Sequence, residues 1–361
     1  MSTHPTILVT SAAGKTGLPT ALQLRERGFP VRAFVRHDDA RAEKLRRVGA
    51  DIFIGNQYDL TDMRRAMAGI QRAYHCAPTA PNGLHFNAIF AAAADEARVE
   101  HIVSMGQWLS SADHPSVFTR EVYISDVLIG ALPHATRTIV NPGWFADNYL
   151  MVLDLAAHLG LFAMPLGPGD EAKNAPPSNE DIASVVVEAL VDPAAHAGKT
   201  YRPTGPELIS PNQIAIAMGN ALGRKVKYMN ISERMMFKAL KALPPPNYSD
   251  EMATQLAVYA EEYRRGAFAV SAPTDIIAWI CGRQSEDFES IVRRYVAARP
   301  DLRPSVGGTL GAMAGFAKML LTRPPNPVRV AEARGHVKIA KPRFVQDSAE
   351  WRAAHDFAAA S

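Results

Sequence analysis

Short apolar runs alternate with longer mixed stretches over the first part of the chain. Runs with the length and composition of buried strands lie at residues 7–9, 31–35, 51–54, 72–76, 101–104 and 137–141. The segments between them are typical of helices, at 15–28, 38–48, 61–67, 85–98 and 116–132. This alternation predicts a doubly wound α/β fold, in which helices cover both faces of a parallel sheet.

The pattern changes at residues 164–177, where prolines and glycines predict a long loop. Beyond it we expect helices at 180–190, 210–222, 232–263 (interrupted at 244–246) and 286–297, and strands at 198–202 and 226–229. Asn179 is placed to cap the first of these helices. We therefore expect an α/β domain of residues 1–160, a smaller α+β subdomain of 161–300 whose strands return to the main sheet, and a C-terminal extension of 301–361.

The C-terminal extension begins with an apolar helix and continues as a basic arm. Residues 307–321 read GGTLGAMAGFAKMLL, which is too short to span a bilayer. We expect this helix to pack on the body of the protein or on a second subunit of a homodimer, because an interfacial membrane helix needs a better defined charged face. Residues 323–343 are basic and interrupted by prolines, as expected of a wrapping arm rather than a domain.

The turn after the first strand carries the first candidate chemistry. Residues 6–17 read TILVTSAAGKTG, so a short strand passes through small residues into a helix that Gly28 is placed to end. Small residues such as Ser11, Gly14 and Gly17 let the backbone approach the pyrophosphate of a dinucleotide, which faces the positive end of the helix. Ser11 replaces the usual first glycine, and such turns often hold no ligand, so the motif alone leaves both interpretations open.

The end of the second strand predicts which dinucleotide binds. Arg36 follows the strand directly, where an arginine accommodates the 2′-phosphate of NADP and an acidic residue favours NAD. Lys15 offers a second positive charge, whereas Asp38 lies later and suits the N-cap of the next helix. We therefore predict NADP(H); the alternative for Arg36 is a solvated charge at a strand edge. Asp59 is a candidate for the adenine amino group or, equally, a loop cap.

Composition narrows the class of protein. The chain has 361 residues, 47% of them hydrophobic and 21% charged, and its net charge of +3 is too small to indicate nucleic-acid binding. Two cysteines exclude a disulfide framework and fit a reducing compartment. The first strand leaves no room for a signal peptide and no apolar run is long enough to cross a membrane, so we expect a cytoplasmic protein. The histidines show no metal-ligand spacing.

Several stretches together resemble the NmrA-like family of atypical short-chain dehydrogenases. They are TSAAGKTG at residues 10–17, VRAFVR at 31–36, NPGWFADN at 141–148, and the segment of 179–228 that begins NEDIASVVVEALV. The resemblance covers about residues 5–300 and implies a Rossmann domain, a small C-terminal subdomain and a cleft between them. The cofactor site that we infer from it and from the turn consists of Ser11, Gly14, Lys15, Thr16, Gly17, Arg36, Asp59, Ala77, Pro78, Met105, Pro142, Gly143 and Phe145.

The same resemblance leaves the reaction open. Short-chain dehydrogenases use a Tyr-x-x-x-Lys pair, but Tyr123 is followed four residues later by Val127. Many family members instead carry a lysine about four residues before an acidic residue on this helix. Asp126 suits the acidic position, yet Val122 stands at that of the lysine. The family includes quinone and related reductases, and also regulators that bind the cofactor without turnover.

Candidates for catalysis and substrate binding follow the strands nearest the expected nicotinamide site. Tyr123, Gln107 and His75 are the candidate proton donors, with Ser104 as a further one. The alternative for Tyr123 is an aromatic packed against the sheet, and that for His75 is a satisfied interior histidine. Trp108, Trp144 and Asn148 are the candidates for binding substrate, because aromatic side chains at this end of the sheet form an apolar wall for a planar molecule.

Two functions from different classes are consistent with these features. The first is an NADPH-dependent reductase that transfers hydride to a small aromatic, quinone or conjugated carbonyl acceptor. Such acceptors need little acid assistance, since solvent can protonate a quinone-type product. The second is a regulatory protein that senses NADP(H) without turnover. The missing lysine supports the second function and the aromatic pocket supports the first, which we favour.

Overall fold

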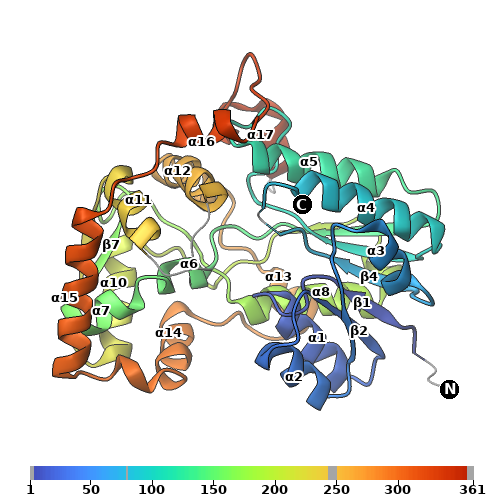
Figure 1. The fold of residues 1–361 in the computed structure, drawn as a ribbon, viewed down its shortest axis with the longest axis horizontal. Coiled ribbons are helices and arrows are strands. Elements are labelled where there is room, and N and C mark those ends of the chain that lie inside the picture. Colours follow the sequence, from blue (N-terminus) through green and yellow to red (C-terminus); the bar gives the residue numbers. More distant parts are fainter. Residues whose placement is uncertain (1–3, 79, 243–249, 356–361) are drawn as a thin grey trace.

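The computed structural model describes residues 4–78, 80–242 and 250–355. A seven-stranded parallel sheet in the order β3-β2-β1-β4-β5-β6-β8 forms its centre (Figure 1). The strands are β1 (Ile7–Val9), β2 (Val31–Val35), β3 (Asp51–Ile54), β4 (Arg72–His75), β5 (His101–Met105), β6 (Thr136–Val140) and β8 (Thr200–Tyr201). The predicted doubly wound fold is therefore confirmed, and β8 is a strand from the second half of the chain that returns to the main sheet.

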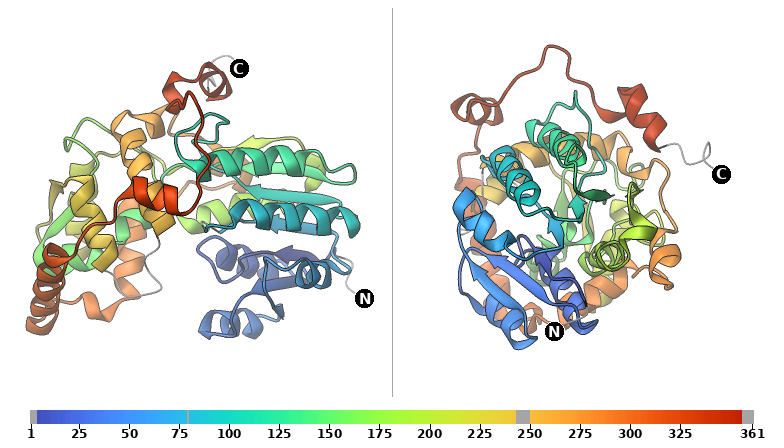
Figure 2. Two further views of the ribbon diagram at one scale, coloured as in Figure 1. Left: turned by 45° about the horizontal axis from the view of Figure 1, so that its top comes forward. Right: turned by 90° about the vertical axis from the view of Figure 1, so that its right-hand side faces the viewer.

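Alternate residues of the short strands supply two separate cores. Ile7 and Val9 face α1 (Gly17–Glu26), α2 (Ala40–Arg47) and α8 (Asn179–Val191), whereas Leu8 faces α3 (Leu60–Met67), α4 (Gly83–Glu96) and α5 (Val117–Gly130). All three residues are fully buried, as expected for strands covered on both faces. The helices thus form layers on either side of the sheet (Figure 2).

The second half of the chain adds a smaller α+β subdomain with its own core. Its two-stranded parallel sheet pairs β7 (Leu161–Met164) with β9 (Lys227–Asn230). The subdomain helices are α6 (Ala146–Leu150), α7 (Leu153–Leu159), α10 (Pro211–Leu222), α11 (Glu233–Ala242), α12 (Asp250–Arg264) and α14 (Phe288–Ala297). Helix α13 (Ile276–Cys281) instead packs on α8 and joins the core of the main sheet. The sequence analysis missed β7 and assigned its last residue to a loop, because this four-residue strand has little pattern of its own and gains its partner only from β9.

Two helix caps lie one residue away from their predicted positions. Asp39, rather than Asp38, caps α2, accepting from the backbone of Arg41 at 2.8 Å. Ser178, rather than Asn179, caps α8, and its hydroxyl accepts from the Asp181 backbone at 3.0 Å. Both capping residues have extended backbone angles. Each stands beside a polar residue of similar capping propensity, so the sequence does not show which of the two is the cap. The expected break at 244–246 lies outside the described residues.

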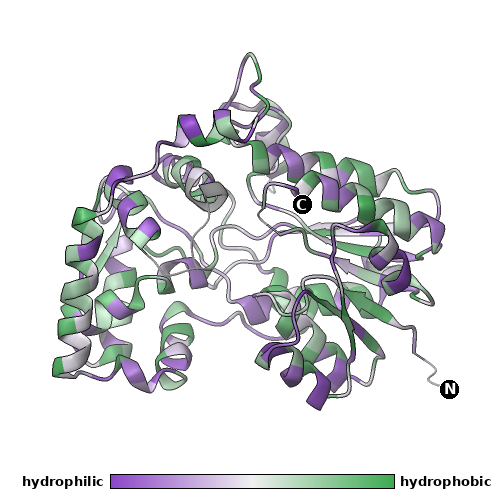
Figure 3. Ribbon diagram, viewed as in Figure 1, coloured by the Kyte–Doolittle hydropathy of each residue, from purple (hydrophilic) through white to green (hydrophobic). Residues whose placement is uncertain are grey.

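The C-terminal extension crosses the molecule. Its first helix, α15 (Val306–Leu321), packs on α7 and α11, which confirms the expected packing on the body of the protein. Lys318 Nζ donates to the Ala242 carbonyl at 2.9 Å, whereas Leu310 and Met313 of α15 are exposed. Much of α15 has the colour of hydrophobic residues in Figure 3. The chain then passes α12 through α16 (Pro327–Ala333) and ends at α17 (Ala349–His355). None of the helices in the described ranges has the length and hydrophobicity to cross a bilayer.

Candidate functional site

A cavity of about 500 Å³ lies beyond the carboxyl ends of the parallel strands. It lies at the point between β1 and β4 where the strand order reverses, because the chain continues from β1 to β2 on one side and from β4 to β5 on the other. This switch point is where open α/β sheets hold their ligands. All the predicted cofactor residues except Asp59 line the cavity: Ser11, Gly14, Lys15, Thr16, Gly17, Arg36, Ala77, Pro78, Met105, Pro142, Gly143 and Phe145. One concave surface thus joins residues from several strand ends.

The turn between β1 and α1 has the backbone shape that a phosphate cradle needs. Ser11 has a φ of 48°, the left-handed conformation that glycine adopts most easily, and its Oγ donates to the Cys76 carbonyl at 2.9 Å. A Cβ on Gly17 would lie 2.3 Å from the Ser11 carbonyl oxygen, and one on Gly14 would lie 2.9 Å from it. The turn is therefore tight enough to require these glycines, and Ser11 takes the conformation of the glycine that it replaces.

A basic corner closes the cavity beyond β2. Arg36 is exposed, lines the cavity and forms no hydrogen bond or ion pair with any other residue in the part of the chain that the structure describes. Arg41, which the sequence analysis missed, lines the same corner and pairs with Asp39 at 2.6 Å. That contact and the cap hydrogen bonds lower the pKa of Asp39 to about 2. The signal for Arg41 was its place in the first turn of α2, close after Arg36.

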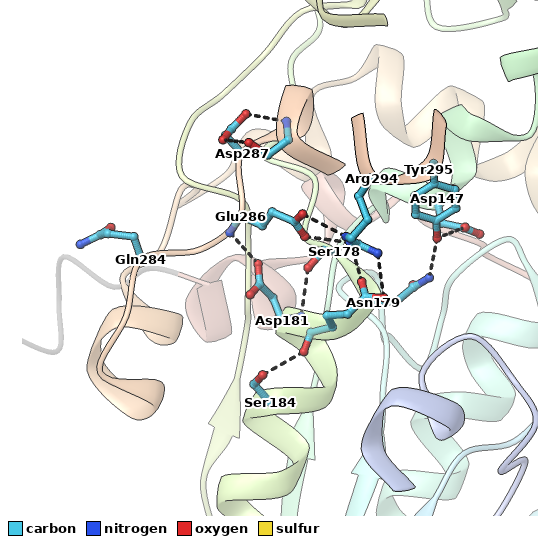
Figure 4. Close-up of polar contacts among 12 residues, drawn as sticks. Asp147, Ser178, Asn179, Asp181, Ser184, Gln284, Glu286, Asp287, Arg294 and Tyr295 are labelled. Carbon is cyan, nitrogen blue, oxygen red and sulfur yellow. Dashed lines mark hydrogen bonds and ion pairs between the residues drawn. The ribbon is translucent and has the colours of Figure 1, made fainter. Parts of the chain in front are cut away.

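Lys15 lines the cavity as predicted and also has a charge partner of its own. Its ammonium group pairs with Asp147 of α6 rather than joining Arg36 in the basic corner. Asp147 also accepts from the Tyr295 hydroxyl of α14 at 2.7 Å (Figure 4). Arg294, next to this tyrosine, donates to both carboxyl oxygens of Glu180 on α8, at 2.9 and 2.8 Å. Lys15 thus takes part in the contacts that join the subdomain to the sheet.

Two predicted site residues have structural partners away from the cavity. Asp59 is the N-cap of α3, where its carboxylate accepts from the Thr61 backbone N–H at 2.7 Å. His75 is buried between Phe86 and Phe90, and its Nε2 contacts Asn87 Oδ1 at 2.9 Å. Burial in this apolar setting lowers the pKa of His75 to about 4. Neither residue lines the cavity, and neither does Ser104.

Helix α5 presents a different face to the cavity than predicted. Phe118, Glu121 and Val122 line the cavity, whereas Tyr123 does not. The spacing i, i+3, i+4 puts the first three on one side of the helix, and Tyr123 lies about 100° further round. Val122 thus lies on the cavity side, at the position where the family resemblance implies a lysine.

Glu121 is a functional candidate that the sequence analysis missed. Its carboxyl group lies near the start of α4, where a Cβ on Gly83 would approach Oε2 to 3.3 Å. Burial raises the pKa of Glu121 to about 7, against a smaller opposing effect of Arg120. A carboxyl group with this pKa is well matched to proton transfer near neutral pH.

Aromatic side chains form the far end of the cavity. Trp108 and Trp144, which are 1% and 2% exposed, line it together with Asn148 and Phe268. Gln107 lines it as well, and its Oε1 accepts from the Tyr259 hydroxyl of α12 at 2.5 Å. Burial raises the pKa of Tyr259 to about 12, so this hydroxyl stays protonated at neutral pH. No group of three or more acidic, histidine or cysteine side chains within the described ranges is arranged to hold a metal ion.

The parallel sheet, the small-residue turn and the cavity at the switch point define a Rossmann-type dinucleotide-binding protein. The model of the NmrA-like family matches residues 3–290, and the chain belongs to that family. The match ends before α15, so the whole C-terminal extension of residues 301–361 lies outside it.

Named relatives and solved structures match this chain over most of their own lengths. An NAD(P)H azoreductase of Xenophilus azovorans is 28% identical over 81% of this chain and 98% of its own. Quinone oxidoreductase 2 of Escherichia coli is 26% identical over 70% of this chain and 85% of its own. The structure of E. coli QOR2 with NADPH matches with a TM-score of 0.68 at 21% identity, covering 80% of this chain and 99% of that one. The negative transcriptional regulator NmrA with NADP matches with a TM-score of 0.69 at 18% identity, covering 82% and 97%.

Proposed function

We propose that this protein is an NADPH-dependent reductase that transfers hydride to a small, planar acceptor such as a quinone, an aromatic azo compound or a conjugated carbonyl compound. One observation carries the proposal: a single cavity runs from the small-residue turn to the aromatic side chains Trp108 and Trp144. The turn would hold the pyrophosphate of a dinucleotide at the first end, and the cofactor would supply hydride to an acceptor held at the second. The azoreductase and the quinone oxidoreductase among the relatives support this class of acceptor.

The residues at the first end fit NADP(H). The backbone of the turn at Ser11 to Gly17 provides N–H groups for the pyrophosphate, and Arg36 and Arg41 provide charge for the 2′-phosphate. When bound, the cofactor supplies hydride. At the other end, Trp108 and Trp144 are almost wholly buried and contribute to an apolar wall, which favours a planar acceptor.

Glu121 is the proton donor that we propose for acceptors that need one. Hydride addition to a carbonyl carbon leaves an alkoxide, which takes a proton from a neutral carboxyl group within reach. The Glu121 carboxylate then regains a proton from water. Glu121 lines the cavity and is half-buried, which keeps a sizeable fraction of it protonated near neutral pH. A reduced quinone is a stabilised anion that water protonates, so this step matters less for quinones.

The test is NADPH oxidation by the purified protein on a panel of quinones, azo dyes and enones. We expect turnover with NADPH to exceed turnover with NADH, and quinones or azo dyes to be better acceptors than simple ketones. Heat-treated protein and an NADPH-free reaction serve as controls. Absence of turnover on the whole panel, with NADPH binding intact, would reject the reductase.

The second candidate function is an NADP(H)-sensing regulator without turnover. The presence of Val122 on the cavity side of α5, in place of the lysine of many relatives, favours it. The fold likeness to the regulator NmrA is compatible with it. The panel above distinguishes the two functions, since a sensor binds NADP(H) and oxidises none.

We keep the cytoplasm as the proposed location, since both cysteines are free thiols.

A further inference from the structure

The last described part of the extension, residues 336–355, returns to the loop that follows β5. The Arg343 backbone N–H donates to the Asp113 carbonyl at 2.9 Å, and the Arg120 guanidinium of α5 donates to the Val337 carbonyl. The loop that receives these contacts also carries Trp108, which lines the cavity. The extension therefore contacts the outer side of the aromatic end of the cavity, where Trp108 and Trp144 lie, which we call the acceptor end.

A buried carboxyl group anchors this contact. Glu262 of α12 is fully buried, and its Oε1 accepts from the Val345 backbone at 2.9 Å and contacts His114 Nε2 at 3.1 Å. His114 Nδ1 accepts from the Ser116 backbone at 3.1 Å, so the ring proton lies on Nε2 and is donated to Glu262. The Val345 backbone is thus one of two groups that contact this buried carboxyl oxygen, and its removal would leave Oε1 with His114 alone, at a cost in stability.

Trp108 is held from two sides. Its indole Nε1 donates to the Ala267 carbonyl at 2.9 Å, and its own carbonyl accepts from Trp351 Nε1 of α17 at 2.8 Å. The His355 ring packs edge-on against Trp108 with centroids 5.2 Å apart and stacks on Trp351 at 3.8 Å. Trp351 and His355 are 3% and 2% exposed, so this contact is a packed core and not a surface touch.

Phe118 is supported by the same segment. Its ring meets His336 edge-on, with centroids 5.3 Å apart. Phe118 lines the main cavity and also a second cavity of about 340 Å³ between α5, α12 and the extension, where Ile339 is among the lining residues. The ring thus has space behind it, and His336 is the extension's aromatic contact that keeps it in place.

We propose that residues 336–355 are part of the acceptor site, in which Trp351 and His355 position Trp108, and His336 positions Phe118, so that the extension sets which planar acceptors fit. The proposal rests on the proposed reductase function. It concerns a part of the chain beyond residue 290, where the family match ends. Among the described residues, the Ser11–Gly17 turn and Arg36 make no comparable contact with residues 336–355, so acceptor binding should respond to them and cofactor binding should not.

The test compares Trp351→Phe and His336→Ala with the wild-type protein. Trp351→Phe keeps an aromatic ring stacked on His355 and removes the indole N–H that donates to the Trp108 carbonyl. Trp279→Phe is the matched control, because Trp279 is 65% exposed on α13. The measurements are kcat and KM for benzoquinone and for naphthoquinone, and the NADPH dissociation constant by titration. We expect KM for benzoquinone to rise about 3- to 10-fold relative to that for naphthoquinone in both variants, the size of a lost hydrogen bond or packing contact. The NADPH dissociation constant and the control should stay at wild-type values.

An unchanged KM ratio in folded Trp351→Phe and His336→Ala proteins would overturn the proposal. If Trp351→Phe does not fold, His336→Ala decides alone, since His336 is only half-buried. If the wild-type protein turns over no acceptor, the reductase fails separately. Naphthoquinone binding to the NADP⁺-loaded wild-type and His336→Ala proteins, followed by tryptophan fluorescence, then decides. Equal affinities, or no binding by the wild-type protein, would overturn the positioning role.

Discussion

The two ends of the cavity are built in different ways. The phosphate end comes from two short stretches, residues 11–17 and 36–41, and relies on backbone shape and exposed positive charge. The acceptor end is assembled from the loop after β5, one face of α5, α12 and, behind them, the extension. A site made from contiguous residues can be read from a sequence, whereas one made from tertiary contacts needs the fold.

The pKa values of ionisable groups at the two ends also shift in opposite directions and for different reasons. At the phosphate end, hydrogen bonds from Arg41 lower the pKa of the partly exposed Asp39 to about 2. At the acceptor end, burial raises the pKa of Glu121 to about 7 and that of Tyr259 to about 12. Asp39 therefore stays ionised, and its negative charge is offset by Arg41, whereas Glu121 and Tyr259 are kept protonated, which suits hydride acceptance.

The largest expected effect is at the phosphate end, from Gly17→Val. A side chain here would collide with the Ser11 carbonyl, since a Cβ alone would be 2.3 Å from that oxygen. The colliding atom is backbone, which cannot move aside without opening the turn. NADPH binding should fall below detection in a titration, while circular dichroism shows a folded protein.

Gly311→Val is the matched control for this change. A Cβ on Gly311, in the exposed face of α15, has no neighbour within 4 Å. NADPH affinity should be that of the wild-type protein. Micromolar NADPH affinity retained by Gly17→Val would mean that the dinucleotide lies elsewhere.

The next largest effect is at the acceptor end, from Glu121→Gln. Gln keeps the shape and hydrogen bonding of the neutral carboxyl group and cannot release its proton. The single-turnover rate on a conjugated carbonyl acceptor should fall about 10²- to 10⁴-fold, the usual contribution of a positioned acid, and the rate on a quinone should fall far less. Asp126→Asn is the control. Burial also raises the pKa of Asp126 to about 7, and this residue of α5 does not line the cavity. Equal losses in the two variants would assign the effect to folding or helix charge.

The same residue predicts a pH dependence. The protonated form of Glu121 is the donor, and its pKa is about 7, so the carbonyl rate should be high below this pH and fall as the pH rises through it. The quinone rate should be nearly flat over the same range. Glu121→Gln should remove the difference between the two profiles. A carbonyl rate that rises with pH through 7 would exclude Glu121 as the acid.

Much of the phosphate end and of the sheet could be predicted, because their signals are local. The strands at 7–9, 31–35 and 51–54 have the expected bounds, and the turn residues line the cavity as a set. The ion pair of Lys15 could not be predicted, because its partner, Asp147, lies far along the chain in another layer of the fold. Glu121 had a signal that was not used, since it follows Phe118 at helical spacing. Nothing in the sequence indicates that Trp351 contacts Trp108.

A smaller effect is expected from Arg36→Ala, which sharpens the distinction between cofactors. The guanidinium lines the cavity with no partner among the described residues, so it is available to a 2′-phosphate. Its loss should weaken NADPH binding by about 1.5–3 kcal/mol, the size of a hydrogen bond to a charged group, and leave NADH nearly unchanged. Arg47→Ala is the control, because the Arg47 side chain is 77% exposed on α2 and pairs with Glu43. Equal weakening of both cofactors would show that Arg36 does not read the phosphate.

The smallest effect is expected from Tyr123→Phe. The sequence made Tyr123 the first candidate acid, but the structure leaves it off the cavity face of α5, which Phe118, Glu121 and Val122 form. Phe retains the ring and its packing and removes only the hydroxyl, so stability and NADPH affinity should not change. Single-turnover rates on both a carbonyl and a quinone should stay within about twofold of wild type, since a hydroxyl out of reach contributes no proton. A carbonyl rate reduced by the factor expected for Glu121→Gln would instead place the Tyr123 hydroxyl at the reacting atoms, which would require α5 to turn when ligands bind. Combining the two changes separates these cases: an acid at Glu121 alone makes the double variant no slower than Glu121→Gln.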